Sequence, residues 1–191
     1  PRHDEGGGMR TIGYLALAAA IATGGAAGAA DAISRYASVN DKKTCAYKHN
    51  KASNDGPESC EFACKGPVAG VSTKLLSCYD YEHLYVKLDG KSFSTWGAMI
   101  AVGGFSGLAN KNGMVEWVFA EGKEPSRASL KGLIVRFQGT DAETNKNRNA
   151  LAVMSLKAGQ ICWKGNYPTN EAARAAIDGA ACQSPLTEEG K

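Results

Sequence analysis

The chain has 191 residues, of which 22 are lysine or arginine and 19 are aspartate or glutamate, so its formal net charge is only +3. Its lysines are interspersed with acidic residues, and no uninterrupted basic stripe exists along which a nucleic-acid backbone could bind. The composition therefore indicates an ordinary solvated surface and argues against nucleic acid as a partner.

The N-terminal region has the pattern of a secretory signal peptide. Met9 is the expected start, and Arg10 supplies a positive charge before an apolar run over residues 12–21 and a small-residue stretch over residues 24–30. A cationic head, about 7–15 apolar residues and an A-x-A-like end are typical of such a leader. The sequence therefore predicts export to the periplasm or secretion.

This leader divides the chain into three parts. We expect residues 1–8 to be a mis-assigned start or added residues, residues 9–29 to be removed on export, and residues 30–191 to form a single β-rich domain. The apolar run is shorter than the roughly 20 residues that a membrane-spanning helix needs. No membrane span is therefore expected after cleavage.

All cysteines lie downstream of the expected cleavage site, and they form an even set: Cys45, Cys60, Cys64, Cys78, Cys162 and Cys182. In an oxidising compartment such a set predicts three disulfides. Four of the cysteines fall in a Cys-rich segment over residues 41–78, so the simplest division pairs these four among themselves and joins Cys162 to Cys182. Pairing of Cys45 with Cys60 and of Cys64 with Cys78 is plausible, and the other two connectivities stay open.

A zinc site is an alternative use of these cysteines. Cys45 and His49 are four residues apart, as are Cys60 and Cys64, so each pair could place two ligands on one side of a helical turn. Export argues against zinc, because the thiols would meet an oxidant before a scarce metal and two further cysteines would lack partners. We therefore expect disulfides, and neither a metal nor another cofactor.

The composition of the expected mature chain changes at residue 70. Residues 31–70 are polar and rich in turn formers, and we expect a stapled loop region there. The strand-like segments that follow are 71–79, 84–88, 92–96, 114–119, 133–138, 151–156 and 161–164. Asp89-Gly90 predicts a hairpin turn, whereas residues 97–113 are ambiguous between a bent strand, a short helix and a buried loop.

A single helix is expected near the C-terminus. Thr169 or Asn170 can cap it, and residues 171–181 form its Ala-rich body. Strands followed by one late helix predict an α+β fold, predominantly an antiparallel β meander with one C-terminal helix. The bond between Cys162 and Cys182 would hold this helix on the sheet.

The C-terminal half carries three short motifs: a Gly-x-Val-Glu-Trp strand over residues 113–117, a Leu-Ile-Val-Arg strand over residues 133–136, and Cys162 followed by an Ala-rich helix that ends at Cys182. In these motifs the chain resembles small, uncharacterised exported proteins of alphaproteobacteria. The resemblance implies a periplasmic location and the terminal disulfide, and it implies no activity.

No set of residues in the sequence forms a catalytic signature. His49 and His83 are the only histidines after cleavage, and no G-x-S-x-G motif presents a nucleophile. We therefore assign no catalytic residue. Glu116 and Arg136 fall on polar positions of two successive strands, where they could form a cross-strand pair or, in a cleft, hold a ligand carboxylate.

Aromatic side chains gather around the hairpin at residues 84–96, and their apolar bodies and polar tips suit a recognition surface. The candidate binding residues are Tyr79, Tyr81, His83, Tyr85, Trp96, Glu116 and Arg136. We expect a non-catalytic binding module for a protein or another envelope component, such as one of the cell wall. The alternatives are an inhibitor of a cell-wall hydrolase such as lysozyme, and an enzyme whose site uses Glu116, Arg136 or His83.

Overall fold

The computed structural model describes residues 33–52, 58–78, 82–102, 106–108, 113–141, 143–157 and 159–189. These residues belong to one compact unit, which begins at Asp31. The expected leader over residues 9–29 lies outside the described residues. Within the described ranges, no helix is long and apolar enough to cross a membrane.

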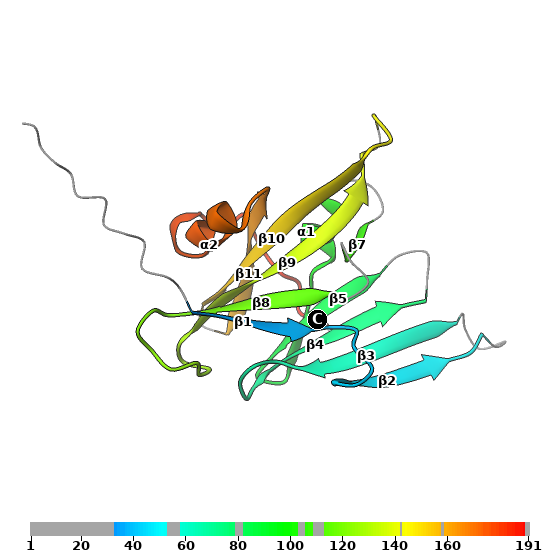
Figure 1. Cartoon of the computed structure of the whole chain (residues 1–191), viewed down its shortest axis with the longest axis horizontal. Coiled ribbons are helices and arrows are strands. Elements are labelled where there is room, and N and C mark those ends of the chain that lie inside the picture. The colour runs from blue at the N-terminus through cyan, green and yellow to red at the C-terminus, as the bar shows by residue number, and fades with distance from the viewer. Residues whose placement is uncertain are drawn as a thin grey trace, which may run out of the picture. The chain divides into compact units, whose positions relative to one another are not determined.

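The described strands form two antiparallel sheets (Figure 1). Sheet A contains β1 (Ile33–Ser38), β7 (Ser106–Leu108), β8 (Met114–Phe119), β9 (Leu130–Thr140), β10 (Asn147–Lys157), β11 (Gln160–Tyr167) and β12 (Ser184–Pro185). Sheet B contains β2 (Cys45–Asn50), β3 (Ser59–Lys65), β4 (Val71–Ser77), β5 (His83–Leu88) and β6 (Lys91–Ser94). Strands β8 to β11 are neighbours in chain order, as are β2 to β6, so each sheet contains a meander.

Sheet A is covered on both faces, and strand β8 shows why. Trp117 and Phe119 are fully buried in the core that includes Leu84 of sheet B. Val118, which points to the opposite face, packs instead in a second cluster with Ile177 of helix α2 (Asn170–Gly179). Alternate residues of one strand therefore contribute to two cores, and the layers are sheet B, sheet A and α2. The face of sheet A that carries α2 is called the outer face below.

The segment after α2 connects the edges of the two sheets. Ser184 and Pro185 form β12, which pairs with β11 of sheet A. The next residues run along β6 of sheet B, where the Ser94 N–H donates to the Thr187 carbonyl at 3.0 Å and the Glu189 N–H donates to the Ser92 carbonyl at 2.8 Å. The C-terminal segment therefore closes the space between β11 and β6.

The structure confirms the α+β fold class, the β meander and the C-terminal helix. It also confirms the disulfide between Cys162 and Cys182, which flank α2. The ambiguous region after residue 96 contains a short helix, α1 (Trp96–Ile100), and β7. The loop predicted over residues 31–70 is wrong, because this region contains three strands, of which β2 exposes five of its six residues and so lacks an apolar pattern.

The plausible pairing of the first four cysteines is also wrong. Strands β2 and β3 form a hairpin whose register places Cys45 directly opposite Cys64, with their Cα atoms 4.3 Å apart, and these two are bonded. The second bond joins Cys60 to Cys78. All six cysteines are therefore in disulfides, which removes the thiols of the alternative zinc site. Three disulfides and no free cysteine indicate an oxidising compartment outside the cytoplasm.

Candidate binding surfaces

Three of the predicted binding residues form a contiguous group, called the aromatic cluster: His83 and Tyr85 of β5 and Trp96 at the start of α1. The ring centroids of His83 and Tyr85 are 4.2 Å apart in a stacked arrangement, and those of His83 and Trp96 are 5.3 Å apart. All three side chains are half-buried. Tyr79 and Tyr81, which were predicted to share this surface, lie outside the described residues.

Polar contacts fix the aromatic cluster to neighbouring strands. The His83 Nε2 atom lies 2.8 Å from the Ser94 hydroxyl of β6. Burial lowers the pKa of His83, Glu189 opposes this effect and Lys74 adds to it. The Lys74 ammonium lies 4.4 Å from the centroid of the Tyr85 ring and 3.4 Å from the Glu189 carboxylate. The cluster is therefore an ordered surface with one ion pair at its border.

Trp96 also lines a groove between the two sheets, called the Trp96–Trp163 groove. Its volume is about 480 Å³, and its lining comprises Ser94, Trp96, Gly97, Ala98, Trp163, Ser184, Pro185, Leu186 and Thr187. Two tryptophans and three hydroxyl side chains line the groove, and none of its lining residues is charged. The sequence analysis missed Trp163, because no local pattern indicates that β11 lies beside the start of α1.

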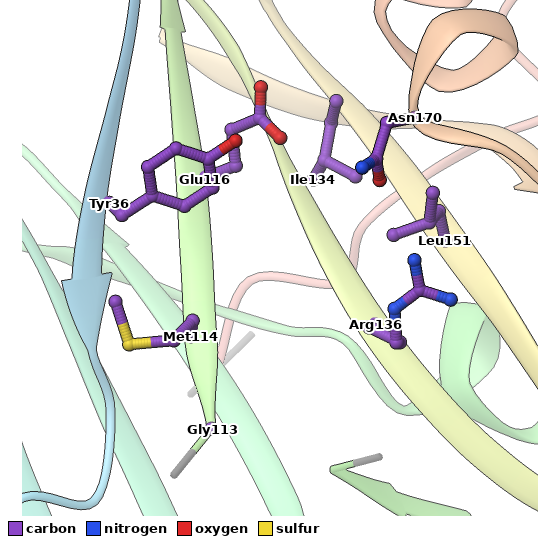
Figure 2. Close-up of a pocket in the computed structure, with 8 residues that line it drawn as sticks. All are labelled: Tyr36, Gly113, Met114, Glu116, Ile134, Arg136, Leu151 and Asn170. Carbon is purple, nitrogen blue, oxygen red and sulfur yellow. The ribbon is translucent and has the colours of Figure 1, made fainter. Parts of the chain in front are cut away.

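The other two predicted residues, Glu116 and Arg136, line a different pocket, on the outer face of sheet A (Figure 2). The expected cross-strand pair between them does not form, because the register places Glu116 opposite Ile134 rather than Arg136. The Glu116 carboxylate instead accepts from the Ser34 hydroxyl at 2.5 Å and from Arg174 Nε at 2.6 Å. The hydrogen bond to Glu116 raises the pKa of Arg174.

The structure does not bring together all three residues of the expected enzyme site. Glu116 and Arg136 lie on the outer face of sheet A, whereas His83 lies on sheet B, against which sheet A packs its other face. Within the described ranges, no three His, Cys, Asp or Glu side chains are grouped so that they could hold a metal ion. The described residues that were predicted to bind a ligand therefore lie on two separate surfaces.

Comparison with known proteins found no relative of this chain: no family model, no curated protein and no solved structure matches it. The functional interpretation therefore depends on these two surfaces alone.

Proposed function

We propose that the protein is an exported, non-catalytic module that binds neutral sugar units of an envelope glycan. The binding site of this proposal is the Trp96–Trp163 groove together with the aromatic cluster. The observation that carries it is the groove lining, in which two tryptophans and three hydroxyl groups occur without a charged side chain.

The chemistry of the groove matches a ligand that is uncharged and amphipathic. A sugar ring has an apolar C–H face that can stack on an indole and hydroxyl edges that can exchange hydrogen bonds with serine and threonine. The groove offers these side chains as Trp96, Trp163, Ser94, Ser184 and Thr187. Its volume of about 480 Å³ falls within the roughly 300–1,000 Å³ of pockets that hold small organic ligands.

The position of Trp96 supports a ligand longer than one ring. This residue lines the groove and also contacts His83 of the aromatic cluster, where the Tyr85 ring follows at 4.2 Å from His83. A glycan chain that occupies the groove could therefore continue over the cluster. Repeated stacking of this kind would bind a polymer more tightly than a single sugar.

The proposal is tested by co-sedimentation of the protein with purified cell-wall sacculi. We expect the wild type to sediment with them and the Trp96→Leu and Trp163→Leu variants to remain in the supernatant. Tyr47→Leu is the matched control, because Tyr47 is an aromatic residue of β2 with 37% exposure that does not line the groove. Thermal unfolding of each variant shows whether its fold is retained.

Two outcomes would contradict this function. The first is a wild type that does not sediment with sacculi, and the second is a folded Trp96→Leu variant that sediments as well as the wild type. Inhibition of lysozyme on a soluble substrate is a further test. If the protein slows lysozyme but does not bind this substrate, the partner of the protein is the hydrolase rather than the glycan.

A further inference from the structure

The outer-face pocket contains the guanidinium group of Arg136, which has no partner among the described residues. Arg136 of β9 is half-buried, and its side chain forms no hydrogen bond or ion pair with any other described residue. Figure 2 shows the guanidinium turned toward Leu151 and Asn170, away from the Glu116 carboxylate. A half-buried cation loses part of its hydration and gains from an anion that reaches it.

The remaining charges of the pocket cancel. Glu116 is only 5% exposed, and its carboxylate accepts from Arg174 and from Ser34, so this negative charge is compensated locally. The Tyr36 hydroxyl accepts from Arg174 Nη2 at 2.9 Å and contributes no charge. Arg136 therefore determines the sign of the pocket, which is positive. Helix α2 begins at Asn170 in the pocket wall, where the exposed Glu171 of its first turn offsets the positive end of the helix dipole.

Three further side chains of the pocket lining are apolar, beside the polar Tyr36 and Asn170. Ile134 and Leu151 are 2% and 4% exposed and form buried walls, while Met114 is 39% exposed. Apolar walls provide no hydrogen bonds to a fully polar anion such as phosphate or sulfate, but they would pack against the hydrocarbon part of an organic acid. The volume of about 190 Å³ lies below the roughly 300 Å³ of ordinary small-ligand pockets. It suits a group about the size of one amino-acid residue.

We propose that the outer-face pocket binds a carboxylate carried by a small, partly apolar group of one-residue size. The carboxylate pairs with the Arg136 guanidinium in a bidentate arrangement, and the hydrocarbon part packs on Ile134, Leu151 and Met114. A free organic acid and the C-terminal residue of a peptide share this chemistry. The site lies on the outer face of sheet A, whereas the Trp96–Trp163 groove lies between the two sheets and shares no lining residue with it, so the site does not depend on glycan binding.

The test is an NMR titration of the protein with four probes: N-acetylalanine, trialanine and the C-terminal amide of each. We expect both acids to shift the backbone amide signals of β8, β9 and the start of α2, with dissociation constants on the order of 1 mM for ligands of this size. The amides, which lack the negative charge, should cause no saturable shift there. Binding of N-acetylalanine alone would assign the pocket to free acids, whereas binding of trialanine alone would assign it to peptide ends.

Substitutions connect the shifts to the pocket. Arg136→Gln should weaken acid binding about ten- to hundredfold, the usual range for a lost hydrogen bond to a charged group. Arg35→Gln, which removes an exposed arginine of β1 outside the pocket, should leave the affinity unchanged. Met114→Trp is a second variant that fills the pocket from an exposed position without removing charge, and it should also abolish binding.

Three results would overturn the proposal. They are equal affinity for an acid and its amide, unchanged affinity of a folded Arg136→Gln variant, and no saturable shift with any acid at concentrations on the order of 10 mM. The Trp96→Leu variant should bind the acids normally, so failure of the carboxylate site and failure of the glycan groove can be told apart.

Discussion

The Nε atom of Arg174 in α2 lies 2.6 Å from Oε1 of Glu116 in β8, and this bond joins residues that are 58 positions apart. Nη2 of the same guanidinium donates to the Tyr36 hydroxyl of β1 at 2.9 Å. One helical side chain thus connects α2 to two strands of sheet A. The two partners differ in exposure, because the side chain of Arg174 is 40% exposed and that of Glu116 only 6%.

Because of this difference, we expect the loss of Arg174 and the loss of Glu116 to destabilise the protein by different amounts. Arg174→Met leaves a buried carboxylate with Ser34 as its remaining partner, and we expect the free energy of unfolding to fall by about 2 kcal/mol, between the values for exposed and buried pairs. Glu116→Gln leaves a guanidinium that water can reach, and about 1 kcal/mol should be lost. Urea denaturation measures both values. Equal losses of unfolding free energy in the two variants would show that the burial of Glu116 does not determine how much each residue contributes.

Removal of the terminal disulfide should destabilise the protein and release α2. Cys162 and Cys182 are 20 residues apart, and a loop of this size corresponds to roughly 3 kcal/mol of unfolded-chain entropy. We expect the Cys162→Ser/Cys182→Ser variant to lose about this amount in urea denaturation and to show faster amide exchange in α2. The Cys60→Ser/Cys78→Ser variant, with a separation of 18, is the control and should leave exchange in α2 unchanged. Unaltered protection of α2 in the first variant would contradict this role.

Stability should fall on mild acidification because of His83. Its pKa in the folded protein is lowered by burial, so between about pH 7.5 and pH 5 the unfolded chain, with a histidine pKa of about 6.5, takes up a proton before the folded protein does. The free energy of unfolding therefore decreases as the pH falls through this range. His83→Gln should reduce this decrease, which chemical denaturation at a series of pH values would measure. An identical pH dependence in the variant would assign the effect to other groups.

Gly132 of β9 should not tolerate a side chain. A Cβ atom there would lie 2.4 Å from the Met154 carbonyl oxygen, which is backbone of the neighbouring strand β10 and cannot move aside without shifting the strand. We expect Gly132→Ala to cost about 1–3 kcal/mol, as overpacked substitutions do. Gly97→Ala, where no atom lies within 4 Å of the added Cβ, is the matched control and should change thermal stability little. If Gly132→Ala kept the wild-type melting temperature, β9 and β10 could move apart at this point without loss of stability.

The local parts of the fold could be predicted from the sequence because their signals are local. Alternating residues identified β8 and β9, the Asp89-Gly90 pair has the positive φ angles of 50° and 83° that a tight hairpin needs, and the Thr169 hydroxyl caps α2 by accepting from Ala172 N–H at 3.2 Å. In each case a few adjacent residues determine the geometry. Residues that are close in space but distant in sequence contribute little to these features.

The parts that were missed depend on contacts between distant segments. The pairing of Cys45 with Cys64 follows from the register of a hairpin whose outer strand, β2, is too polar to be recognised as a strand. Trp163 lines the groove only because the two sheets pack together. Arg136 and Glu116 were correctly placed on one face of the sheet, but the partner of Glu116 comes from the helix. Sequence periodicity predicts which face of the sheet a side chain occupies, but it does not predict which residue contacts that side chain.

The pairing of Ser92 and Ser94 with the last described residues has a consequence for the timing of folding. Strand β1 obtains its partner only when β8 has been made, and β6 obtains its second partner only when residues 187–189 have been made. A chain that leaves the ribosome from its N-terminus therefore carries unpaired strand edges for almost the whole of its synthesis. Final folding is a late event for this molecule, and until then its strands must be kept from pairing with those of another chain.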